Sequence, residues 1–77
     1  KESVEGELIR RETLRSINCF LGTLTAVERS VFLCRYWYLD SSQEIAAKSG
    51  FSETKVRSML RRLRIRLDKH LEKEGLR

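Results

Sequence analysis

A single glycine between two helix-capping signals constrains the fold of this chain more than any other feature. It lies in the stretch "SSQEIAAKSGFSETKVRSMLRRLR", which begins at residue 41. Ser41 stands three residues before Glu44, which is the form of a capping box, and Ser52 can cap a second helix just after the glycine. Gly50 can adopt the left-handed backbone conformation without a Cβ clash. The stretch therefore predicts a short helix, a tight turn and a second helix.

The apolar residues around Gly50 have the spacing of a helix-turn-helix. Ala46 is small enough for the first helix to lie close to the second. Val56, six residues after the glycine, is a branched aliphatic residue that the second helix can bury. Ile45, Phe51 and Met59 are expected to pack alongside. The alternative is an ordinary helical hairpin.

Elsewhere the apolar residues recur at steps of three and four and proline is absent, so we expect an all-α fold of four helices. A second capping box, Thr25 with Glu28, opens one of them, and Gly22 and Gly75 are natural helix ends. The last helix should be about 31 Å long. Its distal turns should therefore pack on the first helix or project. The four helices are expected over about residues 4–21, 26–37, 42–49 and 53–73.

Each of the long helices has a predicted inward face. In the first helix this face comprises Val4, Leu8, Leu14, Ile17 and Leu21. In the second it comprises Val27, Val31, Cys34 and Trp37, with Phe32 and Tyr36 beside them as core aromatics. In the fourth it comprises Val56, Met59, Leu60, Leu63, Leu67 and Leu71.

Length and cysteine content limit the class of protein. Seventy-seven residues make one small domain, and the start at Lys1 rather than at a methionine indicates a fragment of a longer protein. Cys19 and Cys34 are too few for a disulfide framework or a metal site, so we expect two buried thiols in a reducing, cytoplasmic compartment. No apolar stretch approaches the roughly 18 residues of a membrane span, and no membrane partner is expected.

The positive charge lies on one segment. Residues 53–73 carry eight basic and three acidic side chains, whereas the rest of the chain carries eight of each. A neutral body with one basic helix favours a polyanionic partner such as nucleic acid. A basic helix face that is merely solvated is the alternative.

The positions of the charges indicate what this helix presents to a partner. At about 100° per residue, Thr54, Arg57, Ser58 and Arg61 lie on the face away from Val56, and Lys55 and Arg62 lie on a flank where phosphates would pass. The paired N–H donors of an arginine guanidinium match the two acceptors on a guanine edge. The short hydroxyl side chains of serine and threonine allow the helix to approach the bases or the DNA backbone closely. The candidate DNA-binding residues are Ser52, Glu53, Thr54, Lys55, Arg57, Ser58, Arg61 and Arg62.

From residue 24 onward the sequence resembles region 4 of bacterial sigma factors of the sigma-70 family, especially the extracytoplasmic-function group. The matching pieces are Leu24 with Glu28-Arg29, Tyr36, "SSQEIA", Gly50 with Ser52, "KVRSML", then Arg62, Arg64 and Leu67, and a terminal "LEKEGL". The likeness covers about two-thirds of the chain and is specific in combination. Met59 and Leu63 depart from it, because arginine and alanine are common at these two positions.

The resemblance implies a small helical bundle that ends in a helix-turn-helix. Its second helix would read the −35 promoter element, and the domain would dock on the flap of the RNA polymerase β subunit. The base-contacting stretch of the family corresponds to Glu53, Thr54, Lys55, Arg57, Ser58 and Arg61. Region 2, which would melt the −10 element, is absent, so this chain alone should not initiate transcription.

Two other classes of function stay open at this point. The LuxR-type output domain of response regulators shares the "LT…ER…V" opening, "EIA" and a similar turn, although the arginine-rich last helix favours a sigma factor. A protein-interaction module for an anti-sigma factor is the second class, with Ile65 as an apolar contact on a polar face. The sequence gives no support for an enzyme. Asp68 and His70 do not share a helix face, His70 is expected at a solvated helix end, and no cofactor or metal motif appears.

Overall fold

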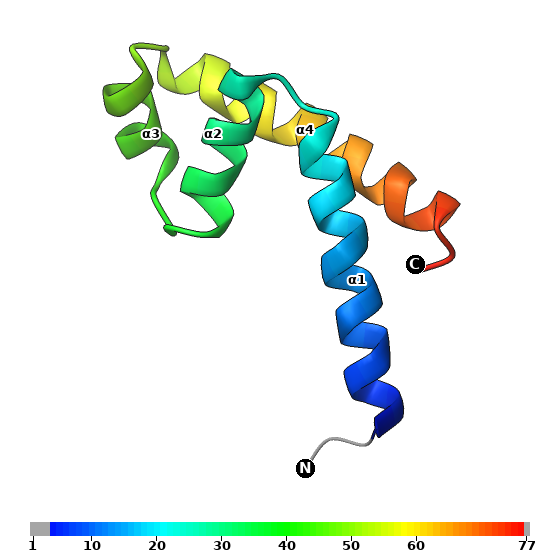
Figure 1. The fold of residues 1–77 in the computed structure, drawn as a ribbon. Helices are drawn as coiled ribbons and strands as arrows, with labels where there is room; N and C mark the ends of the chain where they lie inside the picture. Colours follow the sequence, from blue (N-terminus) through cyan, green and yellow to red (C-terminus); the bar gives the residue numbers. More distant parts are fainter. Residues whose placement is uncertain (1–3, 77) are drawn as a thin grey trace.

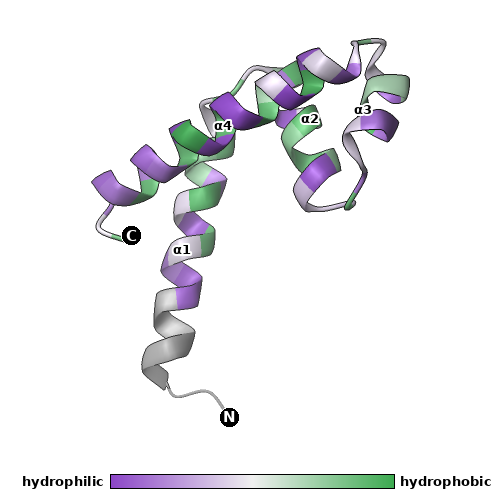
Figure 2. Ribbon diagram, turned by 180° about the vertical axis from the view of Figure 1, so that it is seen from behind, coloured by the Kyte–Doolittle hydropathy of each residue, from purple (hydrophilic) through white to green (hydrophobic). Residues whose placement is uncertain are grey.

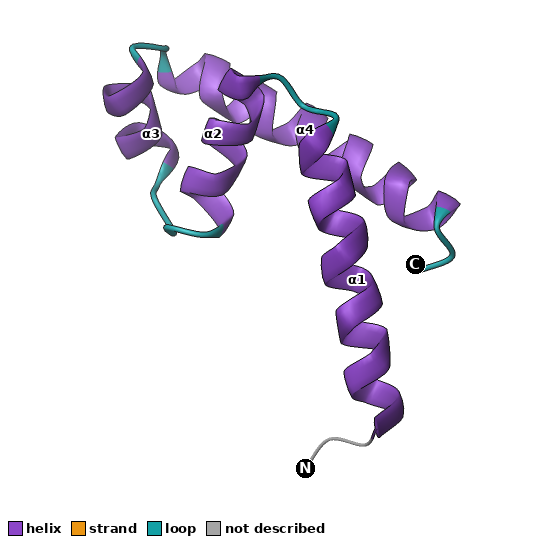
Figure 3. Ribbon diagram, in the orientation of Figure 1, coloured by secondary structure: helices purple, strands orange, loops and turns teal. Residues whose placement is uncertain are grey.

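The computed structural model describes residues 4–76, with side chains from residue 10 onward, and this part of the chain is all-α. It contains four helices: α1 (Val4–Gly22), α2 (Ala26–Tyr36), α3 (Ser42–Ser49) and α4 (Glu53–Lys73). Figures 1 and 3 show the helices joined by short loops. The bounds of α3 and α4 equal the predicted ranges, whereas α1 continues one residue further and α2 ends one residue earlier.

Helix α4 is the element on which the other three helices pack. Helices α2 and α3 lie beside its N-terminal half, and α1 crosses it further along (Figure 1). The N-terminal half of α1 then runs away from the other helices, which gives an elongated shape of 43 × 27 × 17 Å. The distal turns of α4 pack on α1, which is one of the two outcomes that the length of α4 predicted.

Two apolar clusters form the core, and α4 contributes to both. The first joins Val31 of α2 and Ile45 of α3 to residues of α4, and it comprises Val31, Ile45, Val56, Met59 and Leu60. The second joins the end of α1 to α2 and α4, and it comprises Phe20, Leu24, Phe32 and Leu63. Along α4 hydrophobic residues recur between hydrophilic ones (Figure 2). One stripe on a single helix thus holds both halves of the domain together.

Local hydrogen bonds fix where the helices begin and end. Thr25 with Glu28, and Ser41 with Glu44, form the two predicted capping boxes. The Ser52 hydroxyl accepts the Lys55 amide at 3.1 Å. These bonds satisfy amides that have no acceptor within their own helix. Glu28 also binds Arg66 of α4 at 3.2 Å, so the α2 cap is linked to α4.

At the other end of α4, Gly75 adopts a φ of 76°. The amides of Gly75 and Leu76 donate to the carbonyls of Glu72 and Leu71, which is the bonding pattern of a Schellman motif. The glycine ends the helix as its position in the sequence predicted.

The inward face predicted for α2 is partly wrong. Val31 and Phe32 are buried, but the exposed fractions of Val27 and Trp37 are 49% and 76%. Val27 lies in the first turn of α2, in an open hollow that it shares with Ser49 and Phe51, and Trp37 follows the last turn of the helix. Tyr36 is 44% exposed although its ring packs on Phe32 at 4.8 Å, so it is not a core residue either.

Helix α1 also differs from its prediction. Among the side chains of α1 that the structure describes, Ser16 and Phe20 are buried, whereas Leu14 is 55% exposed because much of α1 stands clear of the bundle. Cys19 is exposed, contrary to expectation, and lines a hollow beside Glu74 and Leu76 at the C-terminal end of α4. Cys34 is half-buried against the first cluster. The predicted contacts of Val4 and Leu8 lie outside the described side chains.

The position predicted for His70 is wrong as well. Its Nε2 atom lies 3.0 Å from the Ser16 carbonyl oxygen, and its ring packs on Phe20 at 5.7 Å. The side chain is half-buried rather than solvated, because α1 crosses α4 at this turn. Only the crossing of two helices distant in sequence places it there.

Replacing Gly50 with valine should destabilise the fold without removing any contact. Gly50 has a φ of 81°, where a β-branched residue is strained, while space for a Cβ is open. We expect a loss of about 1–3 kcal/mol and a fall in melting temperature on the order of 10 °C by circular dichroism.

Two variants serve as controls for this prediction. Gly50→Asn should lose less, because asparagine tolerates the left-handed region. Gly22→Ala, at a position with open space and no positive φ, should melt at or above the wild-type temperature. A Gly50→Val variant that melts like Gly22→Ala contradicts the strain account.

Candidate nucleic-acid interface

The turn between α3 and α4 sets the angle at which α4 leaves the bundle. The Gly50 amide donates to the Ala46 carbonyl at 2.9 Å and closes the end of α3. Ile45 and Val56, on the two sides of the turn, are 1% and 0% exposed, and Ala46 packs beside them. Helices α3 and α4 are thus held together by a small apolar contact. This is the helix-turn-helix arrangement that the spacing predicted.

Burying Val56 and Leu60 turns the opposite face of α4 toward solvent. Thr54, Ser58 and Arg61 are all exposed on this face, and Ile65 continues it with 48% of its surface exposed. Of the eight predicted site residues only Glu53 is half-buried; the seven exposed ones are Ser52, Thr54, Lys55, Arg57, Ser58, Arg61 and Arg62. The structure thus gathers all eight at the start of one helix.

Several of these residues already have partners within the domain. The Ser52 hydroxyl caps α4, so its first role is structural. Glu53 forms an ion pair with Arg57 one turn later. The Lys55 ammonium lies over the Phe51 ring, 4.3 Å from its centroid. Because cation–π contact and i,i+4 pairing at exposed sites are each worth about 0.3–1 kcal/mol, a stronger ligand can replace them.

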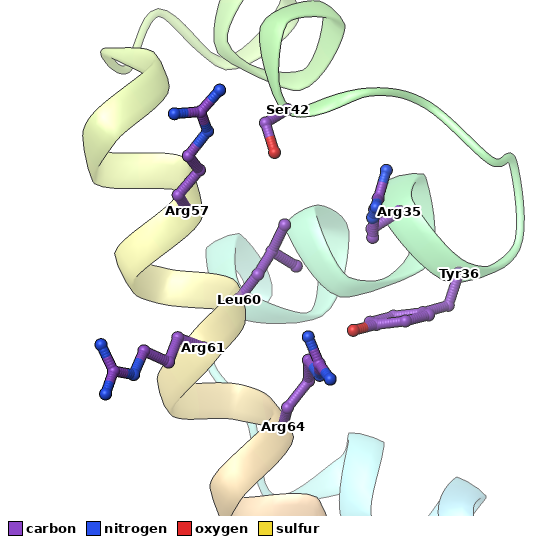
Figure 4. Close-up of a pocket in the computed structure, with 7 residues that line it drawn as sticks. All are labelled: Arg35, Tyr36, Ser42, Arg57, Leu60, Arg61 and Arg64. Atoms are coloured by element: carbon purple, nitrogen blue, oxygen red, sulfur yellow. The ribbon is translucent and has the colours of Figure 1, made fainter.

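Arg57 and Arg61 also border a cleft of about 460 Å³ between α4 and the facing ends of α2 and α3 (Figure 4). Arg35 and Arg64 line this cleft, but sequence reasoning did not select them as site residues. The position of Arg64, seven residues after Arg57 on the same helix face, was a usable signal. No sequence pattern relates Arg35 to α4, because it reaches the cleft through the packing of α2.

No metal-binding cluster accompanies this surface among the residues that the structure describes. In the part of the chain that the structure describes, no three residues among His, Cys, Asp and Glu gather as metal ligands would. None of the described helices combines the length and the apolar content of a membrane span. The exposed arginine, lysine, serine and threonine side chains of the surface offer guanidinium, ammonium and hydroxyl donors.

Comparison with known families identifies this helix-turn-helix. A family model described as "Sigma-70, region 4" matches residues 14–67. The chain belongs to this family. No individual curated protein and no solved structure gives a significant match.

The matched residues run from the middle of α1 to the Leu67 turn of α4, so they include every candidate residue of the interface. Sigma-70 region 4 is a DNA-binding part of sigma factors, which act in transcription initiation. The family match thus confirms the resemblance to sigma region 4 and favours it over the LuxR-type alternative. The region 4 domain described here is a DNA-binding module.

Glu53 should moderate the attraction of this region 4 domain for DNA, because its carboxylate pairs with Arg57 and adds negative charge to the basic start of α4. We expect Glu53→Gln to raise affinity for mixed-sequence duplexes about two- to fivefold, the scale of one exposed charge pair. Fluorescence anisotropy at fixed salt measures this. Glu72→Gln, the same change at the distal end of α4, should have a smaller effect. An equal rise in both variants points to net charge alone.

Proposed function

We propose that this domain recognises the −35 element of promoters as part of an RNA polymerase sigma factor, with α4 in the major groove. The observation that carries the proposal is the exposed polar face of α4, which lies opposite the buried Val56 and Leu60. A helix fits the major groove of B-DNA, where each base pair presents a distinct pattern of donors and acceptors. A sigma factor with this role acts in the cytoplasm.

The roles of the site residues follow from their chemistry and position. Arg57 and Arg61 can each donate two hydrogen bonds to a guanine edge. Thr54 and Ser58 have short side chains that can contact bases or phosphates at close range. The Glu53 carboxylate can accept a hydrogen bond from a cytosine amine. Lys55 and Arg62 lie on the flank of the helix and suit backbone phosphates. Ser52 holds the first turn of α4 in place and lies near the backbone.

Binding should depend strongly on salt, because lysine and arginine release counterions from DNA. With about three to five phosphate contacts, log K should fall against log salt with a slope of about −3 to −5. Selection of bound duplexes from a random pool at moderate salt then gives the preferred sequence. Salt-independent binding contradicts the proposal.

Arg61→Ala should cost about 1–3 kcal/mol on the selected duplex and blur the preference at one base position. The loss follows from an unpaired base edge in the groove. Titration of the selected and random duplexes with the same variant measures it. Equal losses on both duplexes would assign Arg61 to a phosphate instead.

A second surface of the domain supports docking on the polymerase β-flap. A groove of about 630 Å³ lies between α1 and α2 and reaches Leu67 of α4. Apolar side chains dominate its lining, among them Leu14, Ile17, Leu21, Phe32, Tyr36, Trp37 and Tyr38. Exposed apolar surface of this kind marks protein–protein contact sites.

The loop after α2 holds the aromatic side of this groove. Leu39 adopts a φ of 61°, unusual for a residue with a side chain. Asp40 binds Lys48 at 2.6 Å, a bond that raises the pKa of Lys48, and its carbonyl accepts from Arg35 at 3.2 Å. These contacts hold Trp37 and Tyr38 at the surface. We propose that they meet the flap.

Leu14→Asp should abolish binding to the isolated β-flap and leave binding to duplex DNA unchanged. Leu14 is exposed in the apolar groove, and the lining of this groove includes none of the candidate DNA-binding residues. Val27→Asp is the matched control, since Val27 is 49% exposed and lies outside the groove. Pull-down with immobilised flap measures both. A flap that binds the wild-type and Leu14→Asp domains equally well argues against this site.

An anti-sigma factor is a second candidate partner, and Ile65 is the observation that favours it. This aliphatic side chain is 48% exposed on the outward face of α4, beyond Arg61. A partner that covered it would also cover the DNA-binding face. If Ile65→Asp leaves binding to polymerase and to an anti-sigma factor unchanged, the residue is simply solvated.

A further inference from the structure

A hollow of about 240 Å³ lies where α1 meets the C-terminal end of α4. The turn that ends α4 curls back toward α1 (Figures 1 and 2). The lining comes from one face of α1 and from this turn: Glu12, Arg15, Ser16, Cys19, Glu74 and Leu76. None of these six residues lines the apolar groove or belongs to the candidate DNA-binding set. The hollow is therefore a third surface, separate from the other two.

Ser16 is the buried member of this lining, with 3% of its surface exposed. Its carbonyl lies against His70, but its hydroxyl has no hydrogen-bond partner among the described residues. Buried hydroxyls normally have a partner, so this one indicates that a polar group binds beside it. Because Ser16 lines the hollow, a ligand can approach the hydroxyl from that side.

Three charged side chains surround the same hollow. Glu12, Arg15 and Glu74 are all exposed, and none of them takes part in an ion pair with another described residue. Two carboxylates and one guanidinium match a small molecule that carries both an ammonium and a carboxylate group. An α-amino acid unit has this pair of charges.

Cys19 adds a reactive group to the lining. Its thiol is exposed, whereas the other thiol of the chain, Cys34, is half-buried against the first cluster. An accessible thiol exchanges with disulfides through its thiolate form. A ligand that joins an amino-acid unit to a sulfur atom therefore suits the thiol, the three charges and the Ser16 hydroxyl together.

We infer that the hollow is a modification site, where Cys19 forms a mixed disulfide with a small thiol of the cysteine class, either the free amino acid or a short peptide that contains it. The Cys19 thiolate attacks one sulfur of the corresponding low-molecular-weight disulfide. A new S–S bond forms as the old one breaks, and the second half leaves as a thiolate that takes up the proton lost by Cys19. The Cys19 sulfur is oxidised and the leaving thiol is reduced, so the exchange needs no other oxidant.

The lining residues bind the amino-acid unit of the adduct. Arg15 holds its carboxylate, Glu12 and Glu74 hold its ammonium, and the Ser16 hydroxyl donates to a carboxylate or amide oxygen. The adduct thus bridges α1 and the end of α4. Excess thiol reverses the reaction, so the modification responds to the state of the surrounding thiol pool.

The test measures how fast Cys19 reacts with cystine, with oxidised glutathione and with the neutral 2-hydroxyethyl disulfide. Trypsin separates the two thiols, because Cys19 falls in residues 16–29 and Cys34 in residues 30–35, and mass spectrometry scores each peptide. The control combines Cys19→Ser with Asn18→Cys, which places a thiol at an exposed neighbouring position in the apolar groove.

The rate of Cys19 relative to the control thiol should be about three- to tenfold higher for a charged disulfide than for the neutral one, the scale of two exposed charge pairs. The cystine and glutathione arms distinguish the free amino acid from the peptide as its source. Equal ratios for all three disulfides overturn the inference, because Cys19 is then an exposed thiol without a binding site.

Arg15→Gln should lower this preference about two- to fivefold and leave the reaction with the neutral disulfide unchanged. Arg11→Gln is the matched control, since it makes the same change at an exposed position of α1 outside the hollow, and it should keep the full preference. Equal effects of the two variants also overturn the inference, because they point to net charge alone.

Ser16→Ala tests the buried hydroxyl. The variant should melt at or above the wild-type temperature, because no hydrogen bond is removed, and it should show a weaker preference for the charged disulfides. A lower melting temperature or an unchanged preference contradicts the role given to Ser16. All rates are measured without DNA, so the outcome is independent of the proposed function.

Discussion

The burial of one apolar stripe on α4 is the constraint from which the rest of the structure follows. Val56 and Leu60 bind α2 and α3 through the first cluster, and Leu63 binds the end of α1 through the second. Without this stripe no two of the other helices would form a substantial core. Because the stripe fixes the rotation of α4 about its axis, it also decides which side chains face solvent. Stability and the placement of the DNA-binding face therefore depend on the same contacts.

A second consequence is that two surfaces of different chemistry share one boundary. Tyr36 lines both the arginine-lined cleft and the apolar groove. Under the proposed function, DNA on one surface and polymerase on the other would be neighbours on the same domain.

Local sequence signals predicted the elements that depend on neighbouring residues. The capping boxes and the left-handed Gly50 are short-range features, and the stripe of α4 needs only helical periodicity, so each could be read from the chain. The inward faces of α1 and α2 were less predictable. Leu14 and Trp37 continue apolar stripes but are exposed, because a stripe is buried only where another helix covers it.

The sequence by itself determined that the chain forms four helices, that Gly50 turns between two of them, and that the start of α4 is basic opposite its apolar stripe. Periodicity, capping and charge act within one or two helical turns, and for that reason they can be read directly. Only the tertiary structure decided that Arg35 joins Arg64 around one cleft, that His70 lies against α1, and that α1 and α2 leave an apolar groove open. These features arise where helices distant in sequence cross, and crossing is set by the packing of the whole core.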